Sequence, residues 1–119
     1  MKGVHISRET VSSNGSLDFY FQYTKNDKSL RVCVELKNAH NPKIEDVMIY
    51  QLPEYIKDTG NKDGIYLVLW YKDKQFDKPT KYNSISYLAG MLNSNIPKDY
   101  RISPLIIDCS RFKITPSKK

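Results

Sequence analysis

The chain has 119 residues, of which 39% are hydrophobic, 27% charged and 12% aromatic. This length allows one compact domain over residues 1–119, and the composition excludes a globally disordered chain. No apolar run approaches the roughly 20 residues that span a bilayer, and the N-terminal sequence MKGVHISRE lacks the apolar core of a secretory signal. We therefore expect a cytoplasmic protein that does not enter a membrane.

The charge of the chain favours polyanionic partners. Lysine and arginine outnumber aspartate and glutamate by 19 to 13, which gives a net charge of +6. The two cysteines, Cys33 and Cys109, lie far apart in apolar stretches and lack the spacing of a zinc site or a disulfide framework. We expect both to be reduced residues of the packed interior.

Two segments near the N-terminus alternate apolar and polar side chains with the period of β-strands, residues 15–24 and 29–38. The polar residues between them predict a β-hairpin. A hairpin closed by either two or four residues pairs positions whose numbers sum to 53, so we expect Asp18 opposite Glu35. Residues 4–11 are expected to form a further edge strand.

The rest of the chain predicts alternating helices and strands. Apolar residues at helical spacing over 44–56 indicate an amphipathic helix, kinked at Pro53. The apolar run 65–71 predicts a strand at the centre of the sheet, covered on both faces. A second helical stripe is expected over 82–92 and a last strand over 105–109. This order predicts a mixed sheet with packed helices, an α/β or α+β fold.

The hairpin carries the strongest candidate for chemistry. Like charges placed opposite each other across two strands are destabilising, so Asp18 and Glu35 require a compensating cation. Lys37, on the same face as Glu35, is one candidate; a divalent ion is the other, because Mg²⁺ accepts two carboxylates, a backbone carbonyl oxygen and water. Such a site is suited to metal-assisted phosphodiester hydrolysis, with Lys37 beside the attacking water. The alternative is an ordinary ion-pair cluster on a solvated strand face.

Two further features are open to a functional or a structural interpretation. Gln51 lies on the apolar stripe of the first helix, four residues before Tyr55, so its amide would either reach the carboxylates or mark the boundary of the buried stripe. A loop rich in lysine and aromatic residues would either form a rim for a nucleic-acid strand or be a solvated loop. Its members are Tyr71, Lys72, Lys74, Phe76, Lys78, Lys81 and Tyr82.

Three motifs in this order, LDF at 17–19, VELK at 34–37 and QLPEY at 51–55, resemble the PD-(D/E)XK nuclease superfamily. The spacing from Gln51 to Tyr55 is similar to the Q-x-x-x-Y element of its RecB-like, exonuclease-type branch, and the resemblance spans residues 15 to about 72. It implies a restriction-endonuclease-like mixed sheet flanked by helices, and Mg²⁺ or Mn²⁺ as cofactor. It also implies a nucleic-acid substrate, for which DNA is expected rather than RNA. The site residues that the resemblance implies are Asp18, Glu35 and the Leu36 carbonyl as metal ligands, Lys37 as the catalytic lysine, and Gln51 and Tyr55 as support.

The N-terminal stretch departs from this pattern. Such nucleases usually begin with a helix that flanks the sheet and often contributes an acidic residue, whereas no helical pattern precedes Gly15 and Glu9 is the only acid before Asp18. We expect either a domain excised from a longer protein or a minimal form completed as a homodimer. The predicted function is a metal-dependent nuclease. The alternative is a non-catalytic nucleic-acid- or protein-binding module that keeps the fold, accessory to an ATPase or defence protein.

Overall fold

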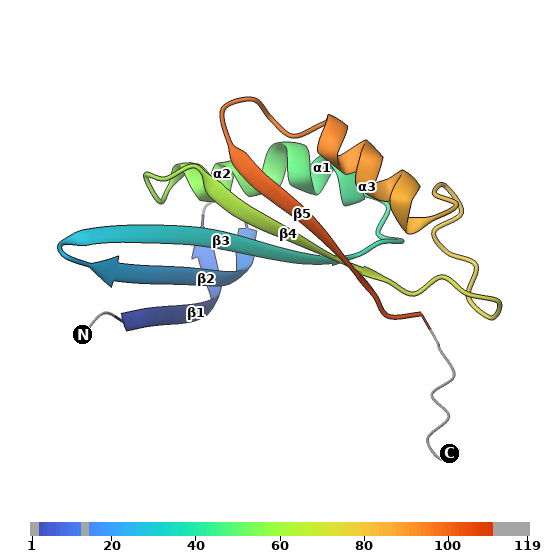
Figure 1. Ribbon diagram of the computed structural model, residues 1–119, viewed down its shortest axis with the longest axis horizontal. Helices are drawn as coiled ribbons and strands as arrows, with labels where there is room; N and C mark the ends of the chain where they lie inside the picture. Colours follow the sequence, from blue (N-terminus) through green and yellow to red (C-terminus); the bar gives the residue numbers. More distant parts are fainter. Residues whose placement is uncertain (1–2, 13–14, 111–119) are drawn as a thin grey trace, which may run out of the picture.

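The computed structural model describes residues 3–12 and 15–110, with side chains from Phe19 onward. Five strands in this part form one mixed sheet in the order of the chain (Figure 1). Their bounds are β1 (Gly3–Ser12), β2 (Gly15–Lys25), β3 (Lys28–Asn38), β4 (Asp63–Trp70) and β5 (Arg101–Asp108). Strands β1 to β3 form an antiparallel meander, whereas β3, β4 and β5 run parallel. The predicted α+β fold with a mixed sheet is confirmed.

The hairpin of β2 and β3 has the predicted register. Asn26 and Asp27 close it, and their φ angles of 52° and 65° are those of the tight turns that suit twisted strands. Every pair from Phe19 with Val34 to the last pair before the turn has residue numbers that sum to 53. The expected edge strand over residues 4–11 is β1, which pairs with β2.

The first helical region contains a π-helical turn. Its parts are α1 (Ile44–Asp46), η1 (Val47–Gln51) and α2 (Leu52–Lys57). The Leu52 N–H donates to the carbonyl of Val47, five residues back. Pro53 follows at once and has no N–H to continue an α-helical ladder, and the wide π-helical turn lies just before this proline, the residue at which the sequence predicts a kink.

The second helix, α3 (Ile85–Ser94), begins three residues later than predicted. Tyr82 continues the apolar spacing, yet it lies in the preceding loop. Ser84 sets the start of the helix, because its side chain accepts a hydrogen bond of 3.1 Å from the Tyr87 N–H. The last strand is longer than predicted, and its edge position tolerates Pro104, which cannot donate to a neighbouring strand.

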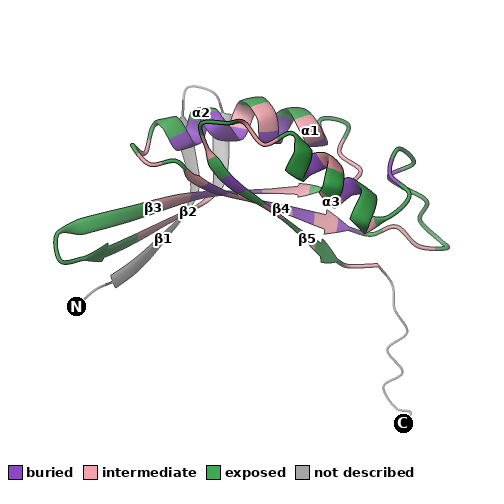
Figure 2. Cartoon of the chain, turned by 45° about the horizontal axis from the view of Figure 1, so that its top comes forward, coloured by how far each residue is buried: buried purple, intermediate pink, exposed green. Residues whose placement is uncertain are grey.

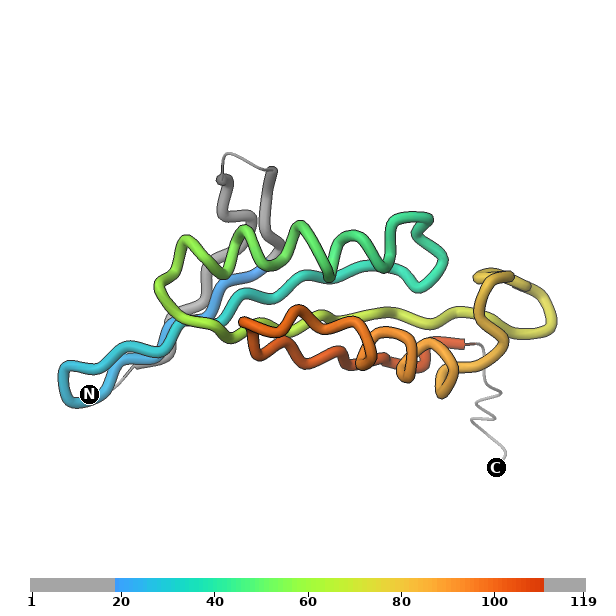
Figure 3. The backbone as a smooth tube through the Cα atoms, turned by 90° about the horizontal axis from the view of Figure 1, so that it is seen from above, coloured from blue at the N-terminus to red at the C-terminus, as the bar shows by residue number. Residues whose placement is uncertain are grey.

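The described helices all lie on one face of the sheet (Figures 1 and 3). Helix α2 contacts β3 and β4, and α3 contacts β5. The core draws on both layers, and buried positions recur along the helices and along β3 and β4 (Figure 2). Its largest fully buried apolar and aromatic side chains are Tyr66, Tyr82, Met48, Leu52, Ile56, Leu88 and Leu92.

The expectation for residues 65–71 is wrong in two respects. Strand β3, not β4, is the central strand of the sheet. Burial alternates along β4, so that Tyr66 and Val68 are buried while Ile65 and Leu67 are half-exposed. Both faces of β4 are apolar, as the sequence indicates, but helices cover only one of them in the described part of the chain.

Candidate active site

Glu35 and Lys37 project from β3 on the face that the first helical region covers. They share this face with Cys33, a member of the buried core, because successive side chains alternate along a strand. The Glu35 side chain is 2% exposed and that of Lys37 is 29% exposed, and Lys37 Nζ lies 3.4 Å from Glu35 Oε2. The predicted Glu–Lys pair on one face is therefore confirmed, with its carboxylate inside the protein rather than on a solvated surface.

Tyr66 flanks Glu35 on the neighbouring strand. The parallel register pairs it with Glu35, and its hydroxyl donates a 2.6 Å hydrogen bond to the Ile44 carbonyl. Burial, and then the Glu35 carboxylate, raise the pKa of Tyr66, so its hydroxyl stays neutral. Tyr66 thus ties the start of α1 to the sheet beside Glu35. The sequence does not single out this residue, because residues 65–71 form a continuous apolar run, and only the structure shows that burial alternates along β4.

Cys33 lies two residues before Glu35 on the same buried face. Burial raises the pKa of its thiol to about 12, and the carboxylates of Asp58 and Glu35 act in the same direction. A thiol with this pKa carries no charge at neutral pH and is a poor nucleophile. Cys33 and Cys109 are both free cysteines; Cys33 is buried as expected, whereas Cys109 is half-exposed after β5.

Asp18 belongs to β2, one residue before Phe19. Phe19 pairs with Val34, so continuing the observed register by one residue brings the Asp18 backbone opposite Glu35. The Asp18 side chain lies outside the described residues, as does that of Glu9. The sharing of a site by Asp18 and Glu35 therefore stays a prediction.

Gln51 and Tyr55 lie in the helical region that packs over the Glu35 face. Gln51 is the last residue of η1 and is half-buried, whereas Tyr55, one turn later in α2, is buried. Gln51 stands at the margin of the buried stripe, between Met48 and Leu52. The structure thus brings Glu35 and Lys37 into contact, and it brings Gln51 and Tyr55 to the same layer as part of the covering helix.

The predicted metal ligands are all oxygen donors, the class that Mg²⁺ and Mn²⁺ bind. Among the described side chains, no group of three His, Cys, Asp or Glu residues is placed to hold a metal ion. Glu35 is the one carboxylate of the predicted set within that part of the chain, and Leu36 contributes a backbone carbonyl. The residues fit Mg²⁺ in their chemistry, and completing the set depends on Asp18.

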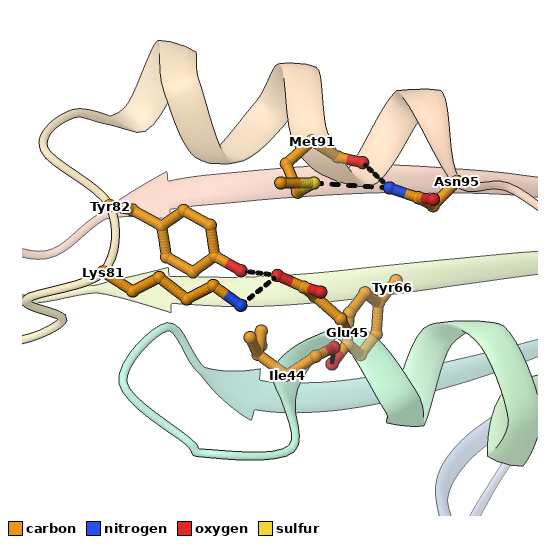
Figure 4. Close-up of polar contacts among 7 residues, drawn as sticks. All are labelled: Ile44, Glu45, Tyr66, Lys81, Tyr82, Met91 and Asn95. Carbon is orange, nitrogen blue, oxygen red and sulfur yellow. Dashed lines mark hydrogen bonds and ion pairs between the residues drawn. The ribbon is translucent and has the colours of Figure 1, made fainter.

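A second polar cluster lies between α1 and the loop before α3 (Figure 4). Glu45 accepts hydrogen bonds from Lys81 Nζ, at 3.0 Å, and from the hydroxyl of Tyr82. A cavity of about 360 Å³ opens beside it, lined by residues 39–42, 44–46 and 78–82. Sequence analysis missed this cluster, because no periodicity links residues that are 36 positions apart.

The lysine-rich loop is partly internal. Lys72 Nζ donates to the carbonyl of Pro79 at 2.8 Å and to that of Tyr82 at 3.1 Å, so it closes the loop on itself. Lys81 is engaged by Glu45, and Tyr82 is buried in the core. Of the seven members of this loop, Tyr82 is therefore not available as a rim residue, and the Lys72 ammonium is held by backbone carbonyls.

The aromatic part of this loop does lie at the surface. Tyr71 and Phe76 are exposed and pack edge-on against His40, with ring centroids 6.3 and 5.0 Å from the His40 ring. Lys74 and Lys78 are exposed in the same loop. These residues follow the carboxyl ends of β3 and β4, where open parallel sheets commonly bind ligands.

The comparison with protein families gives one match. The family model described as a domain of unknown function, DUF8371, matches residues 1–73. The chain belongs to this family. The DUF8371 match covers the three motifs with all the predicted site residues, whereas α3 and β5 lie outside it. A comparison with curated proteins and with solved structures finds no match. None of the helices described for this DUF8371 member is long and apolar enough to cross a membrane.

Proposed function

We propose that this domain is a metal-dependent nuclease that hydrolyses phosphodiester bonds of DNA or RNA. The observation that carries the proposal is the contact between the buried Glu35 carboxylate and the partly exposed Lys37 ammonium. In an ordinary ion pair on a solvent-exposed strand face, both side chains remain in contact with water. A carboxylate that is withdrawn from water and held against a cation that still reaches the surface is typical of a functional site.

The order of the elements supports the same interpretation. The β2–β3 hairpin, the helical region with Gln51 and Tyr55, and the apolar strand β4 follow one another in the order that the PD-(D/E)XK resemblance implies. The register observed from Phe19 onward, continued by one residue, would bring Asp18 opposite Glu35. The DUF8371 match includes this whole unit.

Hydrolysis of a phosphodiester builds up negative charge on the phosphoryl oxygens and needs a positioned water. Lys37 would donate a hydrogen bond to the phosphate or the attacking water from the exposed end of its side chain. Glu35 would hold the ammonium in place, and Tyr66 would stay neutral, so that it adds no competing charge. The net charge of +6 would draw the polyanionic substrate to the domain.

Asp18, Glu35 and the Leu36 carbonyl would hold Mg²⁺ or Mn²⁺. When bound, such an ion supplies Lewis-acid chemistry: it withdraws electron density from a phosphoryl oxygen and favours deprotonation of the attacking water. Gln51 and Tyr55 would orient the substrate or the water from the covering helix.

The test compares two carboxylate–lysine pairs of the same chain. Glu35→Gln preserves the size of the side chain and removes its charge, and we expect it to lower Mn²⁺-dependent cleavage of plasmid DNA and single-stranded RNA by about 100-fold or more. Lys37→Ala is expected to have a similar effect. The matched controls are Glu45→Gln and Lys81→Ala, from the pair at 3.0 Å outside the candidate site, which should cleave like the parent chain.

Calorimetric titration with Mn²⁺ gives a second measurement. We expect the parent chain to bind the ion, and Glu35→Gln and Asp18→Asn to bind it at least about tenfold more weakly. Cleavage by Glu35→Gln at the parent rate would overturn the proposal. A parent chain that binds oligonucleotides but neither binds Mn²⁺ nor cleaves them would overturn it too, in favour of a non-catalytic binding module.

A further inference from the structure

The sheet face opposite the helices is apolar and carries no helix within the described residues (Figures 1 and 2). A strand face in contact with water normally bears polar side chains. Here most paired positions of β3, β4 and β5 bear aliphatic ones, Asn38 and Ser103 being polar, and β2 continues the pattern with aromatic residues. We call the partly or fully exposed side chains of this face the open face: Phe19, Phe21, Tyr23, Leu30, Val32, Leu36, Ile65, Leu67, Leu69, Leu105 and Ile107. Val34 shares the face but is only 2% exposed.

The open face is a contiguous surface rather than a scatter of single residues. Leu67 pairs with Leu36 on one side and with Leu105 on the other, so apolar side chains run from strand to strand. Leu105 is 48% exposed, Leu30 46%, Ile107 46% and Tyr23 36%. Together with their half-exposed neighbours they leave roughly 600 Å² of apolar surface, the upper end of what a monomer usually shows.

Among the side chains described for β2 to β5, the middle of the open face carries no charge, and Arg8 of β1 pairs with Phe19 beside it. Other charges lie at the ends of the face, where Asp63 and Arg101 are joined by hydrogen bonds of 2.8 and 3.0 Å and where Lys25 pairs with Lys28 beside the hairpin turn. A surface of this kind gives a polyanion no favourable contact at its centre. It favours an apolar partner of similar extent.

We propose that a second copy of this chain covers the open face, so that two sheets pack face to face around a two-fold axis. All sheets twist with the same hand, so an identical sheet offers matching curvature at the usual separation of about 10 Å. Two such faces would bury about 1,200 Å², the lower limit for a specific stable interface. The same patch on both copies is what a two-fold dimer requires.

This dimer leaves the Glu35 face of each copy on its outer side, under the helices. The inference therefore does not depend on the proposed nuclease activity. Dimerisation and nucleic-acid binding also respond to salt in opposite ways. Each copy carries a charge of +6, so added salt screens the repulsion between two copies and strengthens dimerisation, whereas added salt weakens binding to nucleic acid.

Sedimentation equilibrium of the full chain, over about 1 to 200 µM protein, tests the inference. We expect a dimer with a micromolar dissociation constant that tightens as NaCl is raised. Leu105→Lys and Ile107→Lys should each raise this constant by about tenfold or more. Both positions are about half-exposed on an edge strand, so the new ammonium can reach water in the monomer. Tyr87→Lys and Tyr50→Lys, at exposed positions of the helical layer, are the matched controls and should dimerise like the parent chain.

Circular dichroism melting establishes that each variant folds, and Tyr23→Lys at the other end of the open face replaces any β5 variant that does not. A parent chain that is monomeric at about 200 µM would overturn the inference. The inference would also be overturned if Leu105→Lys and Tyr23→Lys dimerised with the same dissociation constant as the control variants. A monomeric parent that co-sediments with vesicles of phosphatidylserine and phosphatidylcholine would overturn it too, since a lipid surface would then be the occupant.

Discussion

At Gly64, the backbone of β4 lies close to Ile56 of helix α2. A Cβ atom added at this position would lie 2.6 Å from Ile56 Cδ1 and 3.3 Å from Ile56 Cγ1. Ile56 is completely buried, so its side chain can give way only by moving into packed neighbours. We therefore expect Gly64→Ala to destabilise the protein, although alanine usually suits a strand better than glycine does.

The magnitude follows from two opposing terms. Overpacking in a close-packed core costs about 1–3 kcal/mol. Replacing a glycine restores about 0.5–1 kcal/mol by restricting the unfolded chain. The net loss in the free energy of unfolding is thus expected to be about 1–2 kcal/mol. Ile56→Val deletes Cδ1, the nearer of the two contact atoms, and costs about 1 kcal/mol alone. In the double variant the alanine methyl takes the space of Cδ1, so the loss should be about 1 kcal/mol smaller than the sum of the single losses.

Urea unfolding followed by circular dichroism measures this cycle. Gly90→Ala in α3 is the matched control: an added Cβ meets nothing within 4 Å there, and we expect about 0.5–1 kcal/mol of stabilisation. Losses that add within about 0.3 kcal/mol in the double variant would refute the steric argument. A stable Gly64→Ala single variant would refute it also.

Two further outcomes are expected from groups around Glu35. Folding keeps Cys33 protonated up to about pH 12, whereas the thiol of the unfolded chain ionises near pH 9. The Cys33 thiol therefore contributes fully to the free energy of unfolding below pH 9, and this contribution declines by up to about 1.4 kcal/mol per pH unit as the pH rises to 12. Cys33→Ala should reduce this pH dependence in urea titrations. An unchanged pH dependence would contradict the raised pKa. Tyr66→Phe removes the donor to the Ile44 carbonyl and should lower the free energy of unfolding by about 1–3 kcal/mol in the same assay, which parent-like stability would contradict.

The hairpin was predictable from the sequence because its geometry is local. Turn length fixes the pairing of neighbouring strands, and alternation fixes the face of each side chain. These two rules were enough to place Glu35 and Lys37 together on one face of β3 before any coordinates were known. They also give the position of Asp18 on the backbone of β2.

Contacts between distant segments were not predictable in this way. The bond of Tyr66 to Ile44, and the cluster of Glu45 with Lys81 and Tyr82, depend on how the helices dock on the sheet. A pattern of apolar residues also does not reveal what covers them. The apolar run of β4 therefore led to the wrong expectation of a strand covered on both faces.

The wide turn in η1 sets the rotational phase between the two halves of the first helical region. The half that starts at Ile44 is anchored by Tyr66, and the half that follows Pro53 buries Tyr55 against the sheet. In this turn the backbone hydrogen bond spans five residues instead of four, so the turn accommodates one additional residue between these anchors. A change of one residue in the length of this segment would rotate one half against the other by about 100°, so the number of residues between the anchors is as constrained as their identity.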